Sequence, residues 1–200
     1  NAAFLSAVPE SVSKNRSLKV DLVVGERLPY PSSLGNYSTT YFTVNGRVAY
    51  CLESAKPSPP SSDYVADIFE SNLALQKVLY YGYGGPGDIT DSYMPGFDWK
   101  LKYVFTHVAA SYAYCGTDGF HGCTFENVKA SGLWDYIQYL NGLEAPPEAA
   151  IDLSPATAAA YENNGEQRTK EFHLKGDHRN HITLNLPENV TYHSGSTTKT

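Results

Sequence analysis

The dipeptide Asn45-Gly46 restricts the fold of this chain more than any other short segment does. It separates two runs that are rich in β-branched and aromatic residues, Ser38 to Val44 and Arg47 to Leu52. Both central positions of the tightest hairpin turns need positive φ, which Asn and Gly tolerate best. The pattern therefore predicts two antiparallel strands joined by a two-residue turn.

Hydrophobic periodicity orders the remaining segments as strands, then helices, then strands. The central helix is apolar on most sides, which is typical of a helix buried in a core. This order predicts an α+β fold, with an antiparallel sheet or β-sandwich-like core and about three helices grouped on one side. Besides the hairpin, the predicted strands are Leu18–Val24, Arg168–Leu174 and His181–Leu186. The predicted helices are Val65–Tyr81, with a break near Ser71-Asn72, Trp99–Tyr114 and Phe125–Asn141.

Length and charge limit the classes of protein that fit. The 200 residues, 42% of them hydrophobic, can form one sizeable core. We expect a single domain at residues 1–193, followed at residues 194–200 by a Ser/Thr-rich linker to a further domain. The formal net charge of −6, without a basic stripe, argues against a nucleic-acid partner. No apolar run is long enough to cross a bilayer, so we expect no membrane span.

The composition indicates an exported protein. The sequence begins at Asn1 without an initiator Met or an apolar signal stretch, so we expect either a mature fragment or a piece excised for expression. Sixteen Tyr, one Met and few Lys are typical of extracellular chains. We therefore expect an oxidising environment, in which the pairing of cysteines matters.

Cys51 lies at the end of the second hairpin strand, just before a rigid Pro/Ser loop at Lys56 to Ser62. A side chain at such a place can be held still and still be reached. Strand alternation puts Cys51 and Ala49 on the face opposite to the larger Val48 and Tyr50. A free cysteine is also among the residues most often buried and inert, so the position alone does not establish reactivity.

Cys115 and Cys123 lie close together in a glycine-rich segment. In an oxidising compartment we expect them to form a disulfide, which leaves Cys51 as the odd thiol. Two free thiols are the next alternative. A metal site that adds His121 and Asp118 is less favoured than either, because structural metal sites prefer tighter ligand spacing. We expect no cofactor and no metal.

Four segments follow one another along the chain: TTYFTVNG at Thr39–Gly46, AYCLE at Ala49–Glu53, KPSP at Lys56–Pro59 and KVLYYGYG at Lys77–Gly84. As an ordered set they resemble the thioester domains of Gram-positive surface adhesins, which lie at the tips of sortase-anchored proteins and pili. In that family the cysteine of a Tyr-Cys-Leu-Asp/Glu segment condenses with a glutamine side chain and releases ammonia. An amine, such as a lysine of a host protein, then opens the thioester.

The resemblance implies an extracellular, cell-wall-anchored protein with following domains in the same chain. It implies attachment to a protein on a host or neighbouring-cell surface, which carries the amine if the attachment is covalent. The family glutamine lies in a helical segment like Thr-Gln-x-Ala-x-Trp, and the matching piece here is Thr106 to Tyr112. His107 occupies the glutamine position, and an imidazole cannot form the acyl bond that a carboxamide forms.

Three hypotheses follow for Cys51. In the first, the domain keeps the fold, lacks the thioester, and either binds without covalent chemistry or acts as a structural spacer. In the second, Cys51 and His107 form the reactive pair of a cysteine-dependent acyl-transferase or hydrolase, since a nearby imidazole can activate a thiol. In the third, a thioester forms with another glutamine, Gln76 or Gln138. We favour an adhesin and consider an enzyme the less favoured alternative.

Overall fold

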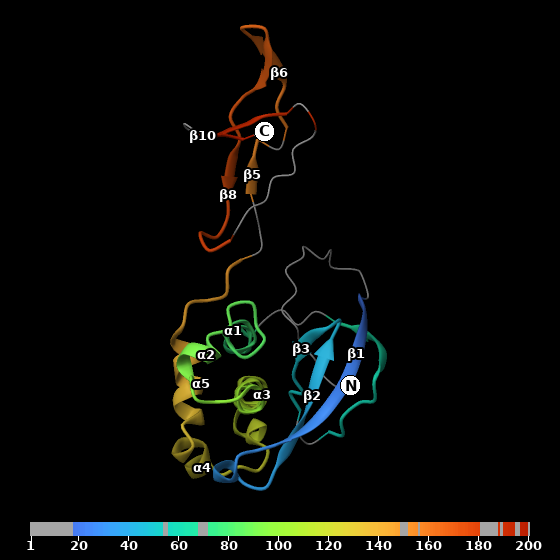
Figure 1. Ribbon diagram of the computed structural model, residues 1–200, viewed down its shortest axis with the longest axis vertical. Helices are drawn as coiled ribbons and strands as arrows, with labels where there is room; N and C mark the ends of the chain where they lie inside the picture. Colours follow the sequence, from blue (N-terminus) through green and yellow to red (C-terminus); the bar gives the residue numbers. More distant parts are fainter. Residues whose placement is uncertain are drawn as a thin grey trace. The chain divides into compact units, whose positions relative to one another are not determined.

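The computed structural model describes residues 18–53, 56–67, 72–148, 152–155, 157–180, 188, 190–194 and 197–199. The chain forms two compact units, one ending at Pro146 and the other beginning at Pro147 (Figure 1). This division does not match the single domain expected at residues 1–193. Compact units are set by contacts between distant segments, which local sequence patterns do not report.

A four-stranded antiparallel sheet forms one side of the first unit, with its strands in the order β3-β2-β1-β4. The predicted hairpin is confirmed, because Val44 pairs with Arg47 across a turn in which Asn45 and Gly46 have φ of 50° and 75°. The Asn45 side chain also accepts a hydrogen bond from the backbone N–H of Asp21 at 2.8 Å, which ties the turn to the neighbouring strand. The strands are β1 (Leu18–Pro29), β2 (Ser38–Val44), β3 (Arg47–Ala49) and β4 (Ser62–Ala66).

Two features of this sheet differ from the sequence prediction. Strand β1 continues to Pro29 through a register shift between Val24 and Arg27. Val65 and Ala66 belong to strand β4, where a helix was predicted to start. The apolar spacing there misled because Val65 lies on the exposed surface of an edge strand and pairs with β1 instead of packing in a helix.

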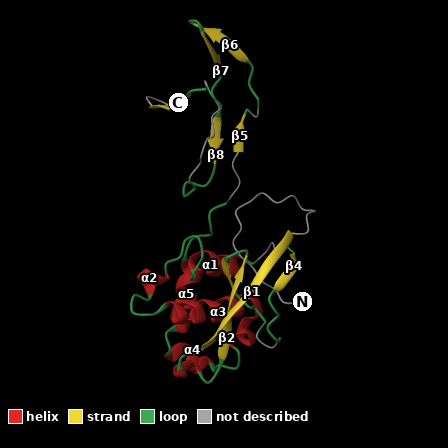
Figure 2. Ribbon diagram, turned by 45° about the vertical axis from the view of Figure 1, so that its right-hand side comes forward, coloured by secondary structure: helices red, strands yellow, loops and turns green. Residues whose placement is uncertain are grey.

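The helices lie together on one side of the sheet (Figures 1 and 2), which confirms the α+β prediction. The helix predicted at 125–141 is interrupted at Ser131-Gly132, where Gly132 has a φ of 81°. The helices are α1 (Leu73–Tyr81), α2 (Thr90–Tyr93), α3 (Trp99–Cys115), α4 (Phe125–Ala130) and α5 (Leu133–Gly142), with short 3-10 turns η1 (Ser32–Leu34) and η2 (Gly116–Phe120).

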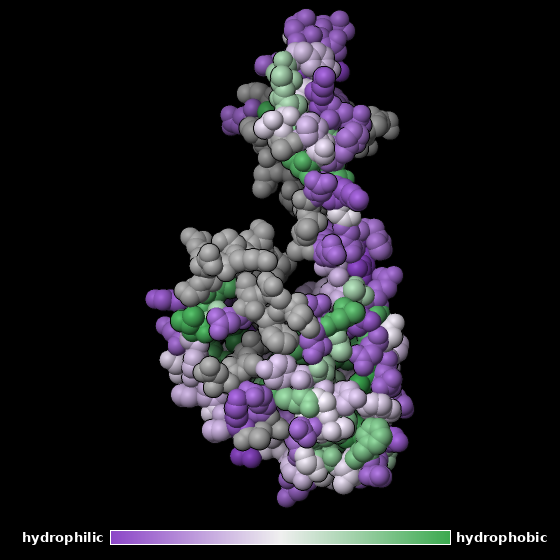
Figure 3. All heavy atoms as spheres, turned by 180° about the vertical axis from the view of Figure 1, so that it is seen from behind, coloured by the Kyte–Doolittle hydropathy of each residue, from purple (hydrophilic) through white to green (hydrophobic). Residues whose placement is uncertain are grey.

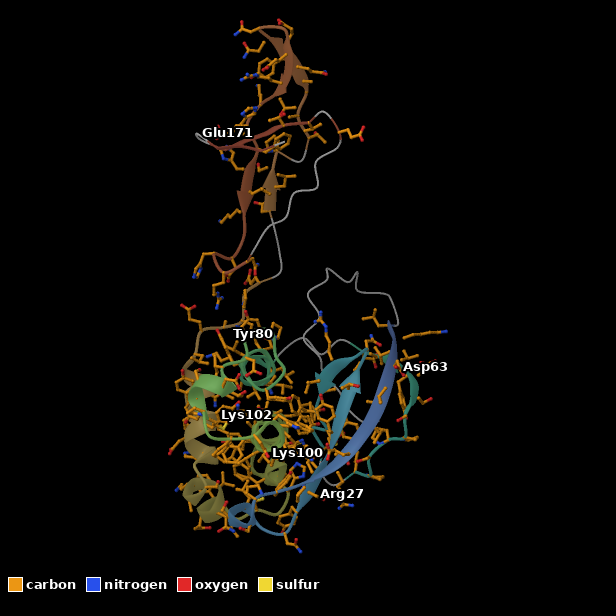
Figure 4. The ribbon with its side chains drawn as sticks, viewed as in Figure 1. Arg27, Asp63, Tyr80, Lys100, Lys102 and Glu171 are labelled. Carbon is orange, nitrogen blue, oxygen red and sulfur yellow. The ribbon has the colours of Figure 1, made fainter. Side chains whose placement is uncertain are left out.

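Helix α3 is the centre of the first unit. Every residue from Lys102 to Ser111 is buried, as the apolar character of this segment predicts. The Asp98 side chain caps its first turn by accepting a hydrogen bond from the N–H of Leu101 at 2.9 Å. Lys102, labelled in Figure 4, keeps its ammonium group paired with the carboxylate of Asp91 at 2.5 Å.

The two faces of the hairpin pack into different apolar clusters. Tyr50 and Leu52 belong to the large cluster that includes the helices, whereas Phe42 and Ala49 belong to a smaller one that Cys51 borders. This arrangement confirms the alternation predicted around Cys51. The Cys51 thiol therefore lies on the face opposite to the side chains of Tyr50 and Leu52, its neighbours in sequence.

Tyr103 fixes α3 to the sheet. Its hydroxyl oxygen lies 2.9 Å from the carbonyl oxygen of Thr40 and 2.8 Å from that of Ala49, and it accepts the N–H of Phe42 at 3.2 Å. The Tyr103 side chain is fully buried, so water cannot replace these contacts. One hydroxyl thus contacts hydrogen-bonding groups of the main chain in two neighbouring strands. These contacts fix the position of α3 relative to the strands.

The described residues of the second unit form three two-stranded antiparallel ladders. Strands β9 and β10 fall partly within residues 194–200, the segment predicted as a linker. The strand predicted at 168–174 is divided between β7 and β8, and the one predicted at 181–186 lies outside the described residues. The ladders pair β5 (Asp152–Ser154) with β8 (His173–Lys175), β6 (Ala160–Asn163) with β7 (Glu166–Thr169), and β9 (Tyr192–Ser194) with β10 (Thr197–Lys199).

Replacing Tyr103 by Phe removes the hydroxyl and leaves buried main-chain groups of β2 and β3 without this partner. We expect the free energy of unfolding to fall by about 1–3 kcal/mol. Urea titration followed by tryptophan fluorescence measures this, because Trp99 and Trp134 both lie in the first unit. Tyr64→Phe is the matched control, since the Tyr64 hydroxyl donates to the Pro60 carbonyl at an exposed site. Equal losses in the two variants would contradict the role given to Tyr103.

Candidate functional site

Cys51 lies just after β3, in a segment without regular secondary structure. Its side chain is partly buried, and its Sγ is 3.5 Å from the carbonyl oxygen of Glu53. Burial is the main cause that raises the pKa of the Cys51 thiol above its ordinary value. The Glu53 carboxylate raises this pKa as well, whereas the Lys56 ammonium opposes the shift. The thiol is therefore held in its neutral form at neutral pH.

One face of α3 contacts the segment that contains Cys51. Ser111 donates a hydrogen bond from its hydroxyl to the Cys51 carbonyl at 3.2 Å, and the Cys115 thiol donates to the Leu52 carbonyl at 3.4 Å. His107, one turn before Ser111, has its ring beside the Cys51 carbonyl. Residues four apart on a helix share a face, so these three side chains line the same strip. The structure thus brings Cys51 and His107 together.

His107 is fully buried, and neither of its ring nitrogens has a hydrogen-bond partner of normal geometry. Burial lowers the pKa of His107 well below its ordinary value, and repulsion from the nearby His121 ring lowers it further. The Cys51 carbonyl opposes this shift without reversing it. The imidazole is consequently neutral at pH 7, stacked parallel to Tyr103 with 6.4 Å between ring centroids.

His121 and Tyr30 complete the cluster, and the sequence did not place either of them beside Cys51. His121 follows η2 in a left-handed conformation, and its Nε2 lies 3.2 Å from the Ser111 hydroxyl. Its ring centroid is 4.6 Å from that of His107. Tyr30 is buried with an unpartnered hydroxyl, 6.2 Å from His107 between ring centroids. In the sequence, the His121-Gly122 dipeptide is the local feature that indicates a turn at this point of the chain.

A tyrosine holds the His121 loop in place. The Tyr37 hydroxyl donates a hydrogen bond to the Gly122 carbonyl at 3.2 Å. A Cβ on Gly122 would lie 2.8 Å from the Tyr37 hydroxyl, and a Cβ on Gly35 would lie 2.9 Å from the Tyr37 ring. Both glycines have positive φ, so two loops close on this ring only because neither carries a side chain.

The disulfide predicted between Cys115 and Cys123 is not formed, because all three cysteines are free thiols. Cys115 ends α3 with its sulfur on the Leu52 carbonyl, whereas Cys123 is buried in the large apolar cluster beyond η2. The short separation in sequence misled, because the intervening η2 turn directs the two side chains to different surroundings. Within the described part of the chain, no group of three or more His, Cys, Asp or Glu side chains is arranged to hold a metal ion.

The glutamines lie elsewhere. Gln76 is on the exposed surface of α1 and Gln138 on that of α5, and the remaining glutamine, Gln167, is exposed in β7 of the second unit. The helical side chains beside the Cys51 segment are His107, Ser111 and Cys115. The third hypothesis, a thioester with Gln76 or Gln138, therefore gains no support from the geometry.

The electrostatics also bear on the second hypothesis. An activated cysteine needs a thiol pKa low enough for a thiolate to form beside a protonated imidazole. Here burial shifts both groups in the opposite sense, raising the pKa of Cys51 and lowering that of His107. The neutral thiol and the neutral imidazole are therefore the favoured forms at this site.

A family model described as a thioester domain matches residues 19–147. The chain belongs to the thioester domain family. A second model, described as a thioester-domain-associated beta sandwich domain, matches residues 152–200, which is consistent with the division into two units. No curated protein and no solved structure matches the chain significantly. Thioester domains are typically found on extracellular surface proteins, and no described helix of this one combines the length and apolar character needed to span a membrane.

The buried His107 and the partly buried His121 make the stability of this thioester domain depend on pH. Both have pKa values below 6.5 in the folded state, that of His121 falling to about 4, so protonation favours the unfolded chain. The free energy of unfolding should be level above pH 6.5 and decline as the pH falls from 6.5 toward 4, by at most about 1.4 kcal/mol per pH unit for each proton taken up.

Urea titrations at several pH values, followed by tryptophan fluorescence, measure this decline. The first unit contains only two histidines, so the variant His121→Asn should lessen the slope between pH 6.5 and 5. A stability that stays level down to pH 5 would show that the rings are not buried as neutral groups.

Proposed function

We propose that this thioester domain attaches its protein to a host or neighbouring-cell surface through noncovalent contacts, without forming a thioester. The observation that carries this proposal is the position of His107. It is buried and neutral beside the Cys51 carbonyl, where the family resemblance expects the acyl-donating glutamine.

The chemistry of the side chain explains the consequence. Thioester formation needs a carboxamide carbon that the sulfur attacks and an ammonia that leaves. An imidazole has no acyl carbon, so Cys51 gains no electrophile from position 107. The raised pKa of the Cys51 thiol, caused mainly by burial, further lowers its reactivity. Covalent capture of an amine through Cys51 is thus the less favoured form of attachment.

Noncovalent attachment needs an accessible surface, and aromatic side chains at the start of α3 supply one. Trp99 is 37% exposed and packs edge-on against Tyr41 with 5.3 Å between ring centroids. Tyr83 stacks beside it at 6.4 Å. The Lys100–Glu26 ion pair, whose atoms are 2.6 Å apart, borders these rings. Tyr and Trp give large contact areas at low entropic cost, which suits protein recognition.

On the face of the molecule shown in Figure 3, apolar groups are scattered among hydrophilic ones and form no single large patch. Binding through a few aromatic anchors with a polar surround is the usual pattern of such surfaces.

We infer that the domain lies at the outer end of a cell-wall-anchored protein and that further domains of the same chain connect it to the wall.

Nothing in the site favours the alternative of a cysteine-dependent acyl-transferase or hydrolase beyond the proximity of His107 to Cys51. The contact is made by the Cys51 carbonyl, and the pKa values of the two groups are shifted away from an ion pair. His107 also lacks an acidic partner to orient its ring, since neither ring nitrogen is hydrogen-bonded.

Fluorescent beads that carry the full chain test the proposal on a cultured animal-cell monolayer and on a bacterial lawn. We expect retention on at least one of them, equal for wild type and Cys51→Ala, and complete release by denaturant. Trp99→Ala should reduce retention several-fold, with Tyr139→Ala as the matched control because Tyr139 is an exposed aromatic residue on α5. Retention that resists denaturant, or that Cys51→Ala abolishes, would contradict noncovalent attachment. Absence of retention on both surfaces would contradict adhesion.

A further inference from the structure

Two of the three thiols of this chain rest on the same short segment. The Cys51 sulfur lies 3.5 Å from the Glu53 carbonyl oxygen, and the Cys115 sulfur lies 3.4 Å from that of Leu52. These carbonyls belong to consecutive residues. The two thiols also lie near enough for Cys115 to act electrostatically on Cys51, although the two cysteines are distant in sequence and belong to different elements.

The backbone around this pair holds the two cysteines close. Ser111 anchors the Cys51 carbonyl to α3 at 3.2 Å, and Cys115 follows Ser111 by one helical turn. The segment after β3 therefore runs along the last turn of the helix. A disulfide needs Cα atoms about 4.4–6.8 Å apart, so the link closes only if the segment and the helix end approach to that separation. Cys51 lies outside regular structure and Cys115 is the last residue of α3, so both backbones can adjust locally.

Accessibility and charge single out the same pair. Cys51 and Cys115 are both partly exposed, whereas Cys123 is buried in the large apolar cluster. The two accessible thiols also share their charged neighbours, because both are influenced by the Glu53 carboxylate and by the Lys56 ammonium. The Cys115 thiol itself is among the groups that act on Cys51.

We propose that Cys51 and Cys115 form an internal disulfide when the domain meets a low-molecular-weight disulfide. One of the two thiolates attacks the small disulfide, forms a mixed disulfide and releases one small thiol. The other thiolate then attacks the protein sulfur of that mixed disulfide and releases the second small thiol. The two protein thiols lose two hydrogens, which end on the two small thiols, and the small disulfide is reduced. The link blocks Cys51 and ties the strand segment to α3.

This cross-linking site does not depend on adhesion, but it does require that Cys51 be a free thiol. The test is intact mass of the full chain, reduced and then incubated with oxidised glutathione. We expect a product lighter by two hydrogens for the wild type and for Cys123→Ser. Cys51→Ser and Cys115→Ser should not give this product and should instead carry glutathione on the remaining accessible thiol.

The linked residues can be identified directly. No Lys or Arg lies between Lys102 and Lys129, so trypsin leaves Cys115 and Cys123 on one peptide, and a protease that cleaves before Asp118 separates them. A Cys115–Cys123 link, or loss of two hydrogens in Cys51→Ser, would overturn the proposal, as would glutathione adducts without an internal link in the wild type. A starting mass short by one ammonia would indicate a thioester and would overturn both this inference and the proposed function.

A melting curve supplies the second readout. Because the link closes a long loop of the chain, the oxidised wild type should melt at a higher temperature than the reduced wild type. Cys115→Ser should melt at one temperature before and after the oxidant, and Cys123→Ser should keep the difference. A reduced Cys115→Ser that melts like the reduced wild type shows that the variant is folded. An oxidised wild type with an unchanged melting temperature would show that the two sulfurs are not joined.

Discussion

The burial of α3 against the sheet is the constraint on which the rest of the first unit depends. The helix is enclosed from Lys102 to Ser111, and the Tyr103 hydroxyl fixes its height against β2 and β3. Once Tyr103 has fixed the position of α3 along the sheet, the side chains one and two turns further along the helix must lie beside the segment that follows β3. His107 and Ser111 then meet the Cys51 carbonyl as a consequence of packing.

The same burial determines what the site can do. The ring nitrogens of His107 and the hydroxyl of Tyr30 are buried without hydrogen-bond partners of normal geometry, and burial of such polar groups opposes folding. The favourable packing of the whole α3 helix offsets this unfavourable free energy. Burial also keeps the imidazole neutral, at the position where the family resemblance expects an acyl donor. We therefore propose that this thioester domain keeps the family fold without its chemistry.

Local signals in the sequence were sufficient for some of this structure and not for the rest. The Asn45-Gly46 turn and the buried character of α3 were predictable, because a turn and a helix face each depend on neighbouring residues. Strand β4 was missed because its pairing with β1 is long-range. The approach of His121 to Cys51, the free state of Cys115 and Cys123 and the division into two units depend likewise on how distant segments meet.

Intact mass of the variant His107→Gln tests the central claim most directly, namely that one side chain separates this domain from thioester chemistry. The account predicts that the wild type has its full mass, that His107→Gln is lighter by one ammonia, and that methylamine adds to the variant alone. Addition of Cys51→Ala should abolish both changes in the variant. A wild type that already lacks one ammonia, or a folded His107→Gln variant that keeps its full mass, would contradict the account.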